Sequence, residues 1–328
     1  MASDLSIVTQ RWVQKALQRF GLDWGLDSTR PWSELAARGA LSGAHLGLGR
    51  ILRLGNLQRE LRHRGEMQWA LWRLPLPRHS QTPRRGRVLW IPGWGDTPFS
   101  WLGVATAVAM RKGFEELVIL DFPGFHGSLA HSRCITEMDR IFEISCDIGK
   151  ELRPEIVVGH SLGGWLAARI AMDLESTVQK LILMAPSGIC GGQEDRERWR
   201  EEFESFVKAE NADDYGSRLF AKTPPGWGKL GSLFIPFLSR EDTRAFLQSI
   251  EQRHFLDEGF SEKLNSLANI EIALLWGELD QVVPARFAHS WMKALPRTQL
   301  TTWTDIGHMP QIEAPVRLVR WLNQHLLG

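Results

Sequence analysis

The sequence has few cysteines and no pattern that would use them. Its three cysteines, Cys134, Cys146 and Cys190, are odd in number and far apart in the chain. There is no Cys-x-x-Cys pair and no cluster of Cys and His at the spacing of metal ligands. We therefore expect a reducing compartment, no structural disulfide and no metal site.

Charge imbalance, long apolar runs and cofactor motifs are also missing. A net charge of +1 over 328 residues gives no reason to expect a nucleic-acid partner. No segment offers 18 uninterrupted apolar residues, and the first residues lack a basic stretch followed by an apolar one, so we expect neither a membrane span nor a signal peptide. The glycines from Gly47 to Gly55 do not form Gly-x-Gly-x-x-Gly, so no dinucleotide cofactor is expected. A soluble cytoplasmic protein without a cofactor is the expectation.

The most informative pattern that is present is Gly-x-Ser-x-Gly at positions 159–163. The apolar run 156–158 precedes it and a helix-like stretch, 164–169, follows it. A serine between a buried strand and a helix lies on a tight turn that exposes its hydroxyl, and glycines on either side leave room for that turn. This context predicts that Ser161 is a nucleophile.

A serine hydroxyl needs a base, and the base needs an acid to orient it. The apolar run 272–276 leads to a turn with Asp280, and the run 300–303 leads to a loop with His308. The order Ser161, Asp280, His308 is the order of the α/β-hydrolase fold.

Short apolar runs alternate with helical stretches along most of the chain. Such runs are typical of strands that are buried on both faces, and their alternation with helices predicts a mainly parallel sheet. We expect an earlier pair of strands within 61–74, and later strands at 88–91, 117–120, 156–158, 181–184, 272–276 and 300–303. Open α/β sheets carry their sites at the carboxyl ends of the strands, which is where the three candidate residues lie.

These motifs resemble those of α/β-hydrolases of the esterase/lipase type. The resemblance spans positions 88–328 and is carried by the 159–163 motif together with Gly93-Trp94-Gly95, Asp121-Phe122-Pro123-Gly124, Gly277-Glu278-Leu279-Asp280 and Gly307-His308-Met309-Pro310. It departs from the family at Pro92-Gly93, where the family usually has His-Gly, and in the spacing of the second glycine after Pro123. The resemblance implies an α/β-hydrolase fold, with a helical lid inserted after the sixth strand.

An acyl-transfer site also needs two donors for its oxyanion. One is expected to be the backbone N–H of Leu162, directly after the serine. The other is expected from the loop after 88–91, at the N–H of Trp94, because Pro92 has no N–H to donate.

Several nearby residues are weaker candidates. Asp305 lies too close to His308 along the backbone to reach the imidazole from behind, and Glu278 is expected to face solvent or support the site from outside. His160 is expected to have a structural role. His126 could equally line the mouth of the site or be a solvated loop residue, and Asp121 is expected to hold its loop.

The predicted lid covers 187–266, where the pattern becomes helical. Any one of its aromatic residues is most safely assigned to the core of the lid itself. As a set, however, its large apolar residues are expected to line an apolar acyl pocket, with Trp227, Leu230, Leu233, Phe234 and Phe237 as the candidates.

The N-terminal segment 1–56 falls outside the resemblance. Positions 1–90 hold 15 Lys or Arg and 6 Asp or Glu, a balance of +9, whereas the remainder has a balance of −8. The favoured interpretation is an extra set of helices packed on the catalytic domain. The alternative is peripheral contact between this basic helical segment and an anionic membrane.

Taken together, the sequence predicts a carboxylic ester hydrolase that works through an acyl-enzyme on a small ester or lipid-like substrate. Its core would comprise 57–186 and 267–328. Carbon–carbon bond hydrolases share the fold, but they often have Asn before the serine and Trp after the histidine, where this chain has His160 and Met309. A thioesterase or an acyltransferase stays open, whereas a complete triad argues against a non-catalytic binding protein. The natural substrate and the oligomeric state are not indicated.

Overall fold

The computed structural model describes most of the chain from residue 57 onward. The described residues are 57–64, 67–76, 85–96, 98–112, 114–121, 138–189, 191–225, 227–228 and 258–327. The predicted N-terminal helices, His126, Cys134, Cys190 and four of the pocket candidates (Leu230, Leu233, Phe234 and Phe237) lie outside these ranges.

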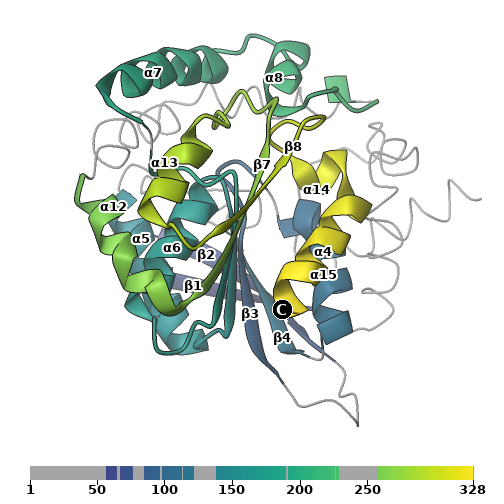
Figure 1. Ribbon diagram of the computed structural model, residues 1–328. Coiled ribbons are helices and arrows are strands. Elements are labelled where there is room, and N and C mark those ends of the chain that lie inside the picture. The colour runs from purple at the N-terminus through teal and green to yellow at the C-terminus, as the bar shows by residue number, and fades with distance from the viewer. Residues whose placement is uncertain are drawn as a thin grey trace, which may run out of the picture.

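An eight-stranded sheet forms the centre of the molecule (Figure 1). Its spatial order is β1-β2-β4-β3-β5-β6-β7-β8. The two pairings that involve β2 are antiparallel, and the five other pairings are parallel. The strands are β1 (Gln58–Arg64), β2 (Met67–Pro75), β3 (Arg85–Ile91), β4 (Phe114–Asp121), β5 (Ile156–His160), β6 (Lys180–Met184), β7 (Glu271–Gly277) and β8 (Gln299–Trp303).

Helices cover both faces of this sheet, and side chains alternate between the two faces along each strand. On β3, for example, Val88 and Trp90 join one core cluster, while Leu89 and Ile91 join the other. One face packs against α4 (Pro98–Lys112) and α15 (Pro315–Leu327). The opposite face packs against α5 (Met138–Leu152), α6 (Leu162–Asp173), α12 (Glu258–Lys263), the short 3-10 helix η2 (Leu264–Asn269) and α13 (Phe287–Ala294).

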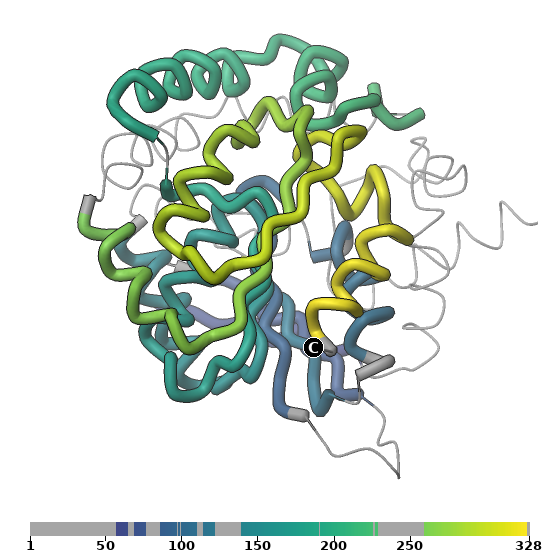
Figure 2. Tube along the Cα trace, in the orientation of Figure 1, coloured from purple at the N-terminus to yellow at the C-terminus, as the bar shows by residue number. Residues whose placement is uncertain are grey.

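Two further helices follow β6, α7 (Gln193–Val207) and α8 (Ala212–Leu219), and they lie in the segment expected to form a lid, so we call them the lid helices. Asn211 starts α8, because its side-chain oxygen accepts the backbone N–H groups of Asp213 and Asp214 at 3.1 and 2.9 Å. In Figure 2 the lid helices lie together along the top of the molecule, apart from the two helical layers.

The lid helices contact the loops that follow the last strands. Trp199 of α7 donates its indole N–H to the carbonyl of Val282 at 3.1 Å, and Arg286 pairs with Glu202 of α7 at 2.6 Å. His308 donates its backbone N–H to the carbonyl of Leu219 at 2.8 Å. The lid helices therefore cover the carboxyl ends of β7 and β8.

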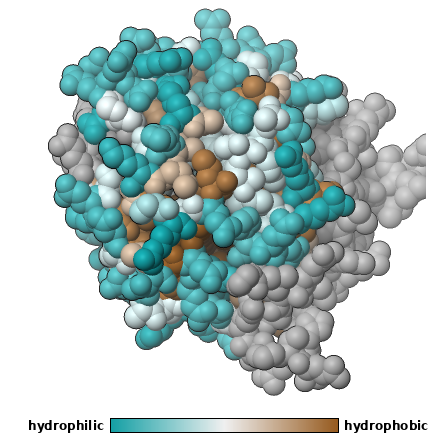
Figure 3. Space-filling model, viewed as in Figure 1, coloured by the Kyte–Doolittle hydropathy of each residue, from teal (hydrophilic) through white to brown (hydrophobic). Residues whose placement is uncertain are grey.

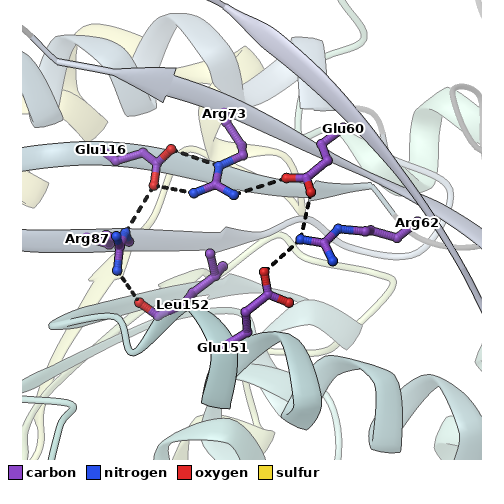
Figure 4. A network of polar contacts seen from close by, with 7 residues as sticks. All are labelled: Glu60, Arg62, Arg73, Arg87, Glu116, Glu151 and Leu152. Carbon is purple, nitrogen blue, oxygen red and sulfur yellow. Dashed lines mark hydrogen bonds and ion pairs between the residues drawn. The ribbon is translucent and has the colours of Figure 1, made fainter.

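The antiparallel end of the sheet carries a network of ion pairs, shown in Figure 4. Arg73 of β2 lies between Glu60 of β1 and Glu116 of β4, at 3.0 and 2.8 Å. Glu116 also accepts from Arg87 of β3 at 3.1 Å. Hydrogen bonds from Arg73 to these glutamates, Glu116 first, raise the pKa of its guanidinium above the usual value. This network joins β1, β2, β4 and β3 through their side chains.

Few large apolar side chains are highly exposed among the residues that the structure describes. The face seen in Figure 3 is mainly hydrophilic in its described part. The large apolar side chains with high exposure among the described residues are Leu61, Leu279, Leu300 and Val316. Among these residues, no helix is long and apolar enough to cross a bilayer.

Candidate active site

Ser161 occupies a strained turn between β5 and α6. Its backbone has φ 55° and ψ −124°, a conformation that a residue with a side chain adopts at a cost of roughly 1–3 kcal/mol. The surrounding backbone holds it there. Its N–H donates to the carbonyl of Met184 at 2.9 Å, and its own carbonyl accepts from Gly164 at 2.9 Å and from Ser187 at 3.0 Å. The turn therefore fixes the serine at the carboxyl end of β5.

Both motif glycines stand where no side chain fits. A Cβ atom on Gly163 would collide with the carbonyl oxygens of Ile91 and Pro92, and one on Gly159 would collide with the carbonyl oxygen of Gly163. The start of α6 thus packs directly against the end of β3. This close approach is the physical reason for the Gly-x-Ser-x-Gly spacing read from the sequence.

Asp280 and His308 form a buried pair. The Nδ1 atom of His308 lies 2.7 Å from Oδ2 of Asp280, and we assign the proton to Nδ1 because a carboxylate oxygen accepts. The other oxygen, Oδ1, accepts the backbone N–H groups of Val282 and Val283, each at 2.9 Å. Both side chains are at most 5% exposed. This pairing leaves Nε2 of His308 as the ring nitrogen available for proton transfer.

His160 supports the same histidine from the other side. Its Nε2–H donates to the backbone carbonyl of His308 at 2.7 Å, and the two ring centroids are 4.6 Å apart. Burial, together with the charge of His308, lowers the pKa of His160 well below its ordinary value, so this side chain is neutral. These contacts agree with the structural role expected for His160.

The two weaker carboxylate candidates are exposed to solvent. Asp305 pairs with Arg317 of α15 at 2.7 Å, and its side chain is 67% exposed. Glu278 is exposed, and its backbone N–H donates to the carbonyl of Trp303. Among the carboxylates that the sequence proposed, Asp280 is therefore the one paired with His308.

The loop after β3 passes close to Ser161. A Cβ atom on Gly93 would lie 3.0 Å from the Cβ atom of Ser161, and Trp94 follows directly. Gly95 adopts φ 74°, which favours glycine, and the loop closes with a 3.3 Å hydrogen bond from the N–H of Asp96 to the carbonyl of Gly93. Leu162 follows Ser161 directly as the first residue of α6, where backbone N–H groups have no acceptor within the helix. The use of these two N–H groups for an oxyanion stays a prediction.

Two acidic residues that sequence reasoning missed hold the loops around the site. Asp96 accepts from Ser100 and Trp101 of α4, each at 2.6 Å, and from Gln311 at 3.0 Å. Its position just before the helix was an available signal, since acidic residues are common at the start of helices. Glu313 in α14 (Pro310–Glu313) accepts backbone N–H groups of the loop that carries His308. No local pattern marks Glu313.

Trp227 is the one described member of the predicted acyl-pocket set. It is 6% exposed, and its indole N–H donates to the carbonyl of Ala212 at 2.8 Å. Its ring packs edge-on against Phe220 at 4.7 Å and stacks with Tyr215 at 6.2 Å. These contacts favour a place in the core of the predicted lid for Trp227, which is the safer interpretation of any single aromatic residue there. The pocket role of the whole set stays a prediction.

Groups suited to metal binding are missing from the described residues. There, no set of three or more His, Cys, Asp or Glu side chains lies close enough to hold an ion. Burial raises the pKa of the Cys146 thiol to about 12, so this cysteine is a poor thiolate ligand near neutral pH.

Comparisons with known proteins agree on the family. The sequence profile of the Alpha/beta hydrolase family matches residues 88–321. One relative is the dihydrolipoyllysine-residue acetyltransferase component of the acetoin cleaving system of Cupriavidus necator, which is 27% identical over 246 residues. The match covers 74% of this chain and only 63% of that protein. The pimeloyl-(acyl-carrier protein) methyl ester esterase of Vibrio vulnificus is 25% identical over 255 residues, 72% of this chain and 93% of that protein.

Solved structures extend the likeness to the fold. An esterase from Exiguobacterium antarcticum superposes with a TM-score of 0.62 at 16% identity, over 80% of this chain and 96% of its own. The eight-stranded, mostly parallel sheet with helices on both faces confirms the fold class expected from the sequence. The profile match covers well over half of the chain, and the chain therefore belongs to the α/β hydrolase family.

Proposed function

We propose that this protein is a serine hydrolase that cleaves carboxylic esters through an acyl-enzyme. The observation that carries the proposal is a strained serine turn together with a buried Asp–His pair, and His160, the neighbour of the serine, contacts the backbone carbonyl of His308. Ser161 is held at φ 55°, and the Asp280–His308 contact measures 2.7 Å. Strained residues persist where the surrounding structure holds them, and they cluster at active sites.

The reaction follows from the roles of these groups. The Nε2 atom of His308 takes the proton of the Ser161 hydroxyl as its oxygen attacks the ester carbonyl. Asp280 keeps Nδ1 protonated and stabilises the imidazolium that forms. The imidazolium then protonates the leaving alcohol, and an acyl-serine ester stays behind. Water, deprotonated by His308, attacks this ester and releases the acid.

The oxyanion of each tetrahedral intermediate would be bound by the backbone N–H groups of Leu162 and Trp94. Preorganised donors of this kind are worth about 2.7–4 kcal/mol each to the transition state. The position of Gly93 against Ser161 supports this assignment, because it brings the loop of Trp94 close to the nucleophile.

The proposed substrate class is an ester with an apolar acyl group. The support is the set of large apolar residues in the predicted lid, together with the Vibrio vulnificus relative, whose name denotes a methyl ester esterase. Each substrate methylene that such a pocket buries adds roughly 0.8 kcal/mol of binding. We therefore expect kcat/KM to rise severalfold from acetyl to about hexanoyl esters and then to level.

A series of nitrophenyl esters and thioesters of increasing chain length tests this substrate class. Phe234→Asp should flatten the rise with chain length while sparing acetyl hydrolysis. Ser205→Asp, an exposed position on α7, is the matched control and should leave the rise intact. If acetyl esters are the best substrates from the outset, the apolar acyl pocket is contradicted.

Acyl transfer is the second candidate, and the Cupriavidus necator relative favours it because its name denotes an acetyltransferase. Transfer would use the same acyl-serine, with an alcohol, amine or thiol in place of water. Adding such acceptors during turnover distinguishes the two. A transferase diverts most of the acyl group to the acceptor at low millimolar concentration, whereas a hydrolase releases the free acid.

A further inference from the structure

The loop that carries His308 lies directly against the end of the second lid helix. We call Leu219–Ala221 the lid return. The backbone N–H of His308 donates to the carbonyl of Leu219 at 2.8 Å. A Cβ atom on Gly307 would lie 2.7 Å from the backbone nitrogen of Ala221 and 2.9 Å from the carbonyl oxygen of Leu219. The backbone of the loop that carries His308 therefore packs directly against the backbone of the lid return.

The carboxylate of Glu313 joins the loop that carries His308 to the lid return. Its Oε1 accepts the backbone N–H groups of Gly307 at 3.0 Å and Met309 at 3.2 Å, one residue on either side of His308. Its Oε2 accepts the N–H of Ala221 at 2.8 Å, and it also lies 3.0 Å from the nitrogen of Gly307. One side chain thus binds the backbone on both sides of the histidine and in the lid return.

These contacts are stronger than ordinary hydrogen bonds because the acceptor carries charge. Burial is the main influence on the pKa of Glu313 and raises it, while the three backbone N–H groups and the charge of His308 oppose that rise. The acidic side chain is therefore kept in a partly buried position, where desolvation disfavours its charge. Burial of this carboxylate is unfavourable by itself, and its hydrogen bonds to the backbone offset that cost.

We propose that Glu313 is a positioning residue for His308 and that it couples the histidine to the lid return. The proposal rests on the proposed function, in which His308 is the general base. Among the described titratable groups, those that contact His308 or carry charge near it are Asp280 from the loop after β7, His160 from β5 and Glu313 from α14. Glu313 thus acts on the backbone of the histidine, as Asp280 acts on its ring.

Glu313→Gln tests the positioning role, with Asp305→Asn as the matched control. Gln is isosteric, but its amide nitrogen cannot accept, so either the bond from Met309 or the bond from Ala221 is lost. We expect kcat to fall about 10- to 100-fold, because small misplacements of a catalytic group have effects of that size, while KM for a short ester changes little. Asp305→Asn removes an exposed carboxylate of the same loop and should leave both constants unchanged.

The pH profile separates positioning from a loss of folded protein. Loss of the Glu313 charge disfavours the protonated imidazolium, so the acid limb of kcat/KM should move to lower pH in Glu313→Gln. A variant that only reduces the amount of folded enzyme lowers the plateau and leaves the limb in place. Glu313→Gln kinetics indistinguishable from those of Asp305→Asn would overturn the proposal.

The lid side of the coupling is tested without touching the carboxylate. Ala221→Pro removes the N–H that bonds Oε2, and Phe220, at φ −120° and ψ 144°, has a conformation that suits the residue before a proline. Ala221→Ser retains the N–H. We expect kcat of the Pro variant to be severalfold below that of the Ser variant. Equal kcat values in the two Ala221 variants would overturn the coupling. This comparison tests the coupling even if Glu313→Gln fails to fold.

A readout without substrate keeps this proposal separable from the proposed function. In NMR spectra, the Nδ1 proton of His308, assigned through its loss in His308→Gln, reports the bond to Asp280. We expect this signal to weaken in Glu313→Gln and to persist in Asp305→Asn. If the wild type cleaves no ester of the series but the signal responds in this way, the proposed function fails while the positioning role stands. If it cleaves esters but the signal is equal in both variants, the positioning role fails.

Discussion

Two networks of charged side chains in this molecule are built on different principles. At the antiparallel end of the sheet, Arg73 lies between Glu60 and Glu116, and each charge faces an opposite charge on a neighbouring strand (Figure 4). At the carboxyl ends of β7 and β8, the carboxylates of Asp280 and Glu313 instead accept backbone N–H groups. The first network is partly solvated, whereas the Asp280 side chain is fully buried.

We expect the first network to contribute to stability and the second to contribute to function. Partly exposed ion pairs each stabilise a fold by about 1 kcal/mol or less, and several of them in a row tolerate the loss of one. A buried carboxylate paired with a histidine contributes little to folding and is instead unfavourable to bury, and the turn of Ser161 is strained as well. Disruption of the first network should therefore reduce stability, whereas disruption of the second should reduce activity.

The largest expected effect is that of Ser161→Ala on activity. Without the hydroxyl there is no acyl-enzyme, and kcat for nitrophenyl esters should fall by about 10⁴ or more. Steady-state kinetics measure the loss. Ser145→Ala removes another buried hydroxyl, which donates to the carbonyl of Ile141 within α5, and should retain activity. Turnover in Ser161→Ala within tenfold of the wild type would contradict the assignment.

Asp280→Asn should have the next largest effect. The amide favours the wrong tautomer of His308, so kcat should fall by about 10³–10⁴ while the protein stays folded by circular dichroism. Asp305→Asn and Glu278→Gln serve as comparisons, since both side chains are exposed to solvent. Should Asp305→Asn prove the more damaging, the roles proposed for the two aspartates are wrong.

The ion-pair network gives the opposite expectation. Arg73→Met removes three hydrogen bonds to Glu60 and Glu116, so the free energy of unfolding in urea should fall by about 1–2 kcal/mol with kcat unchanged. Arg64→Met removes a pair with Asp147 whose side chains are both more than half exposed, and should change stability by less than about 0.5 kcal/mol. A large loss of kcat in Arg73→Met would contradict the claim that this network contributes to stability and not to activity.

His160 makes a smaller, pH-dependent contribution. An unfolded His160 protonates near pH 6.5, but the folded chain keeps it neutral because burial lowers its pKa. Below pH 6.5 the unfolded state thus binds one more proton, and the free energy of unfolding should fall by about 1.4 kcal/mol per pH unit from this residue until the folded pKa is reached. Urea unfolding at several pH values should show a shallower decline in His160→Gln. Equal slopes would mean that His160 protonates in the folded protein.

The sequence predicted the parts of the fold that are encoded locally. The parallel strands lie within three residues of the ranges predicted from apolar runs, and the helix after Ser161 begins at Leu162. The run 300–303 was expected to be buried on both faces, but β8 is an edge strand and Leu300 is 37% exposed. A short apolar run does not indicate whether its strand lies at the edge of the sheet or has a neighbouring strand on each side.

Long-range contacts around the site could not be read from the sequence. Glu313 meets the backbone of Ala221 from 92 positions away, and Gln311 meets Asp96 from 215 positions away. The motif around His308 fixed its own loop but gave no sign of which distant segment packs on it. Such contacts depend on how segments far apart in the sequence pack together at the strand ends, which no local pattern records.

Covalent labelling tests the central claim most directly. A fluorophosphonate reacts with a serine that an imidazole activates, and mass spectrometry of the digested protein locates the adduct. We predict one adduct, on Ser161, with labelling absent from Ser161→Ala and strongly slowed in Asp280→Asn. Undiminished labelling of Ser161→Ala, or an adduct on another residue of the wild type, would contradict the account.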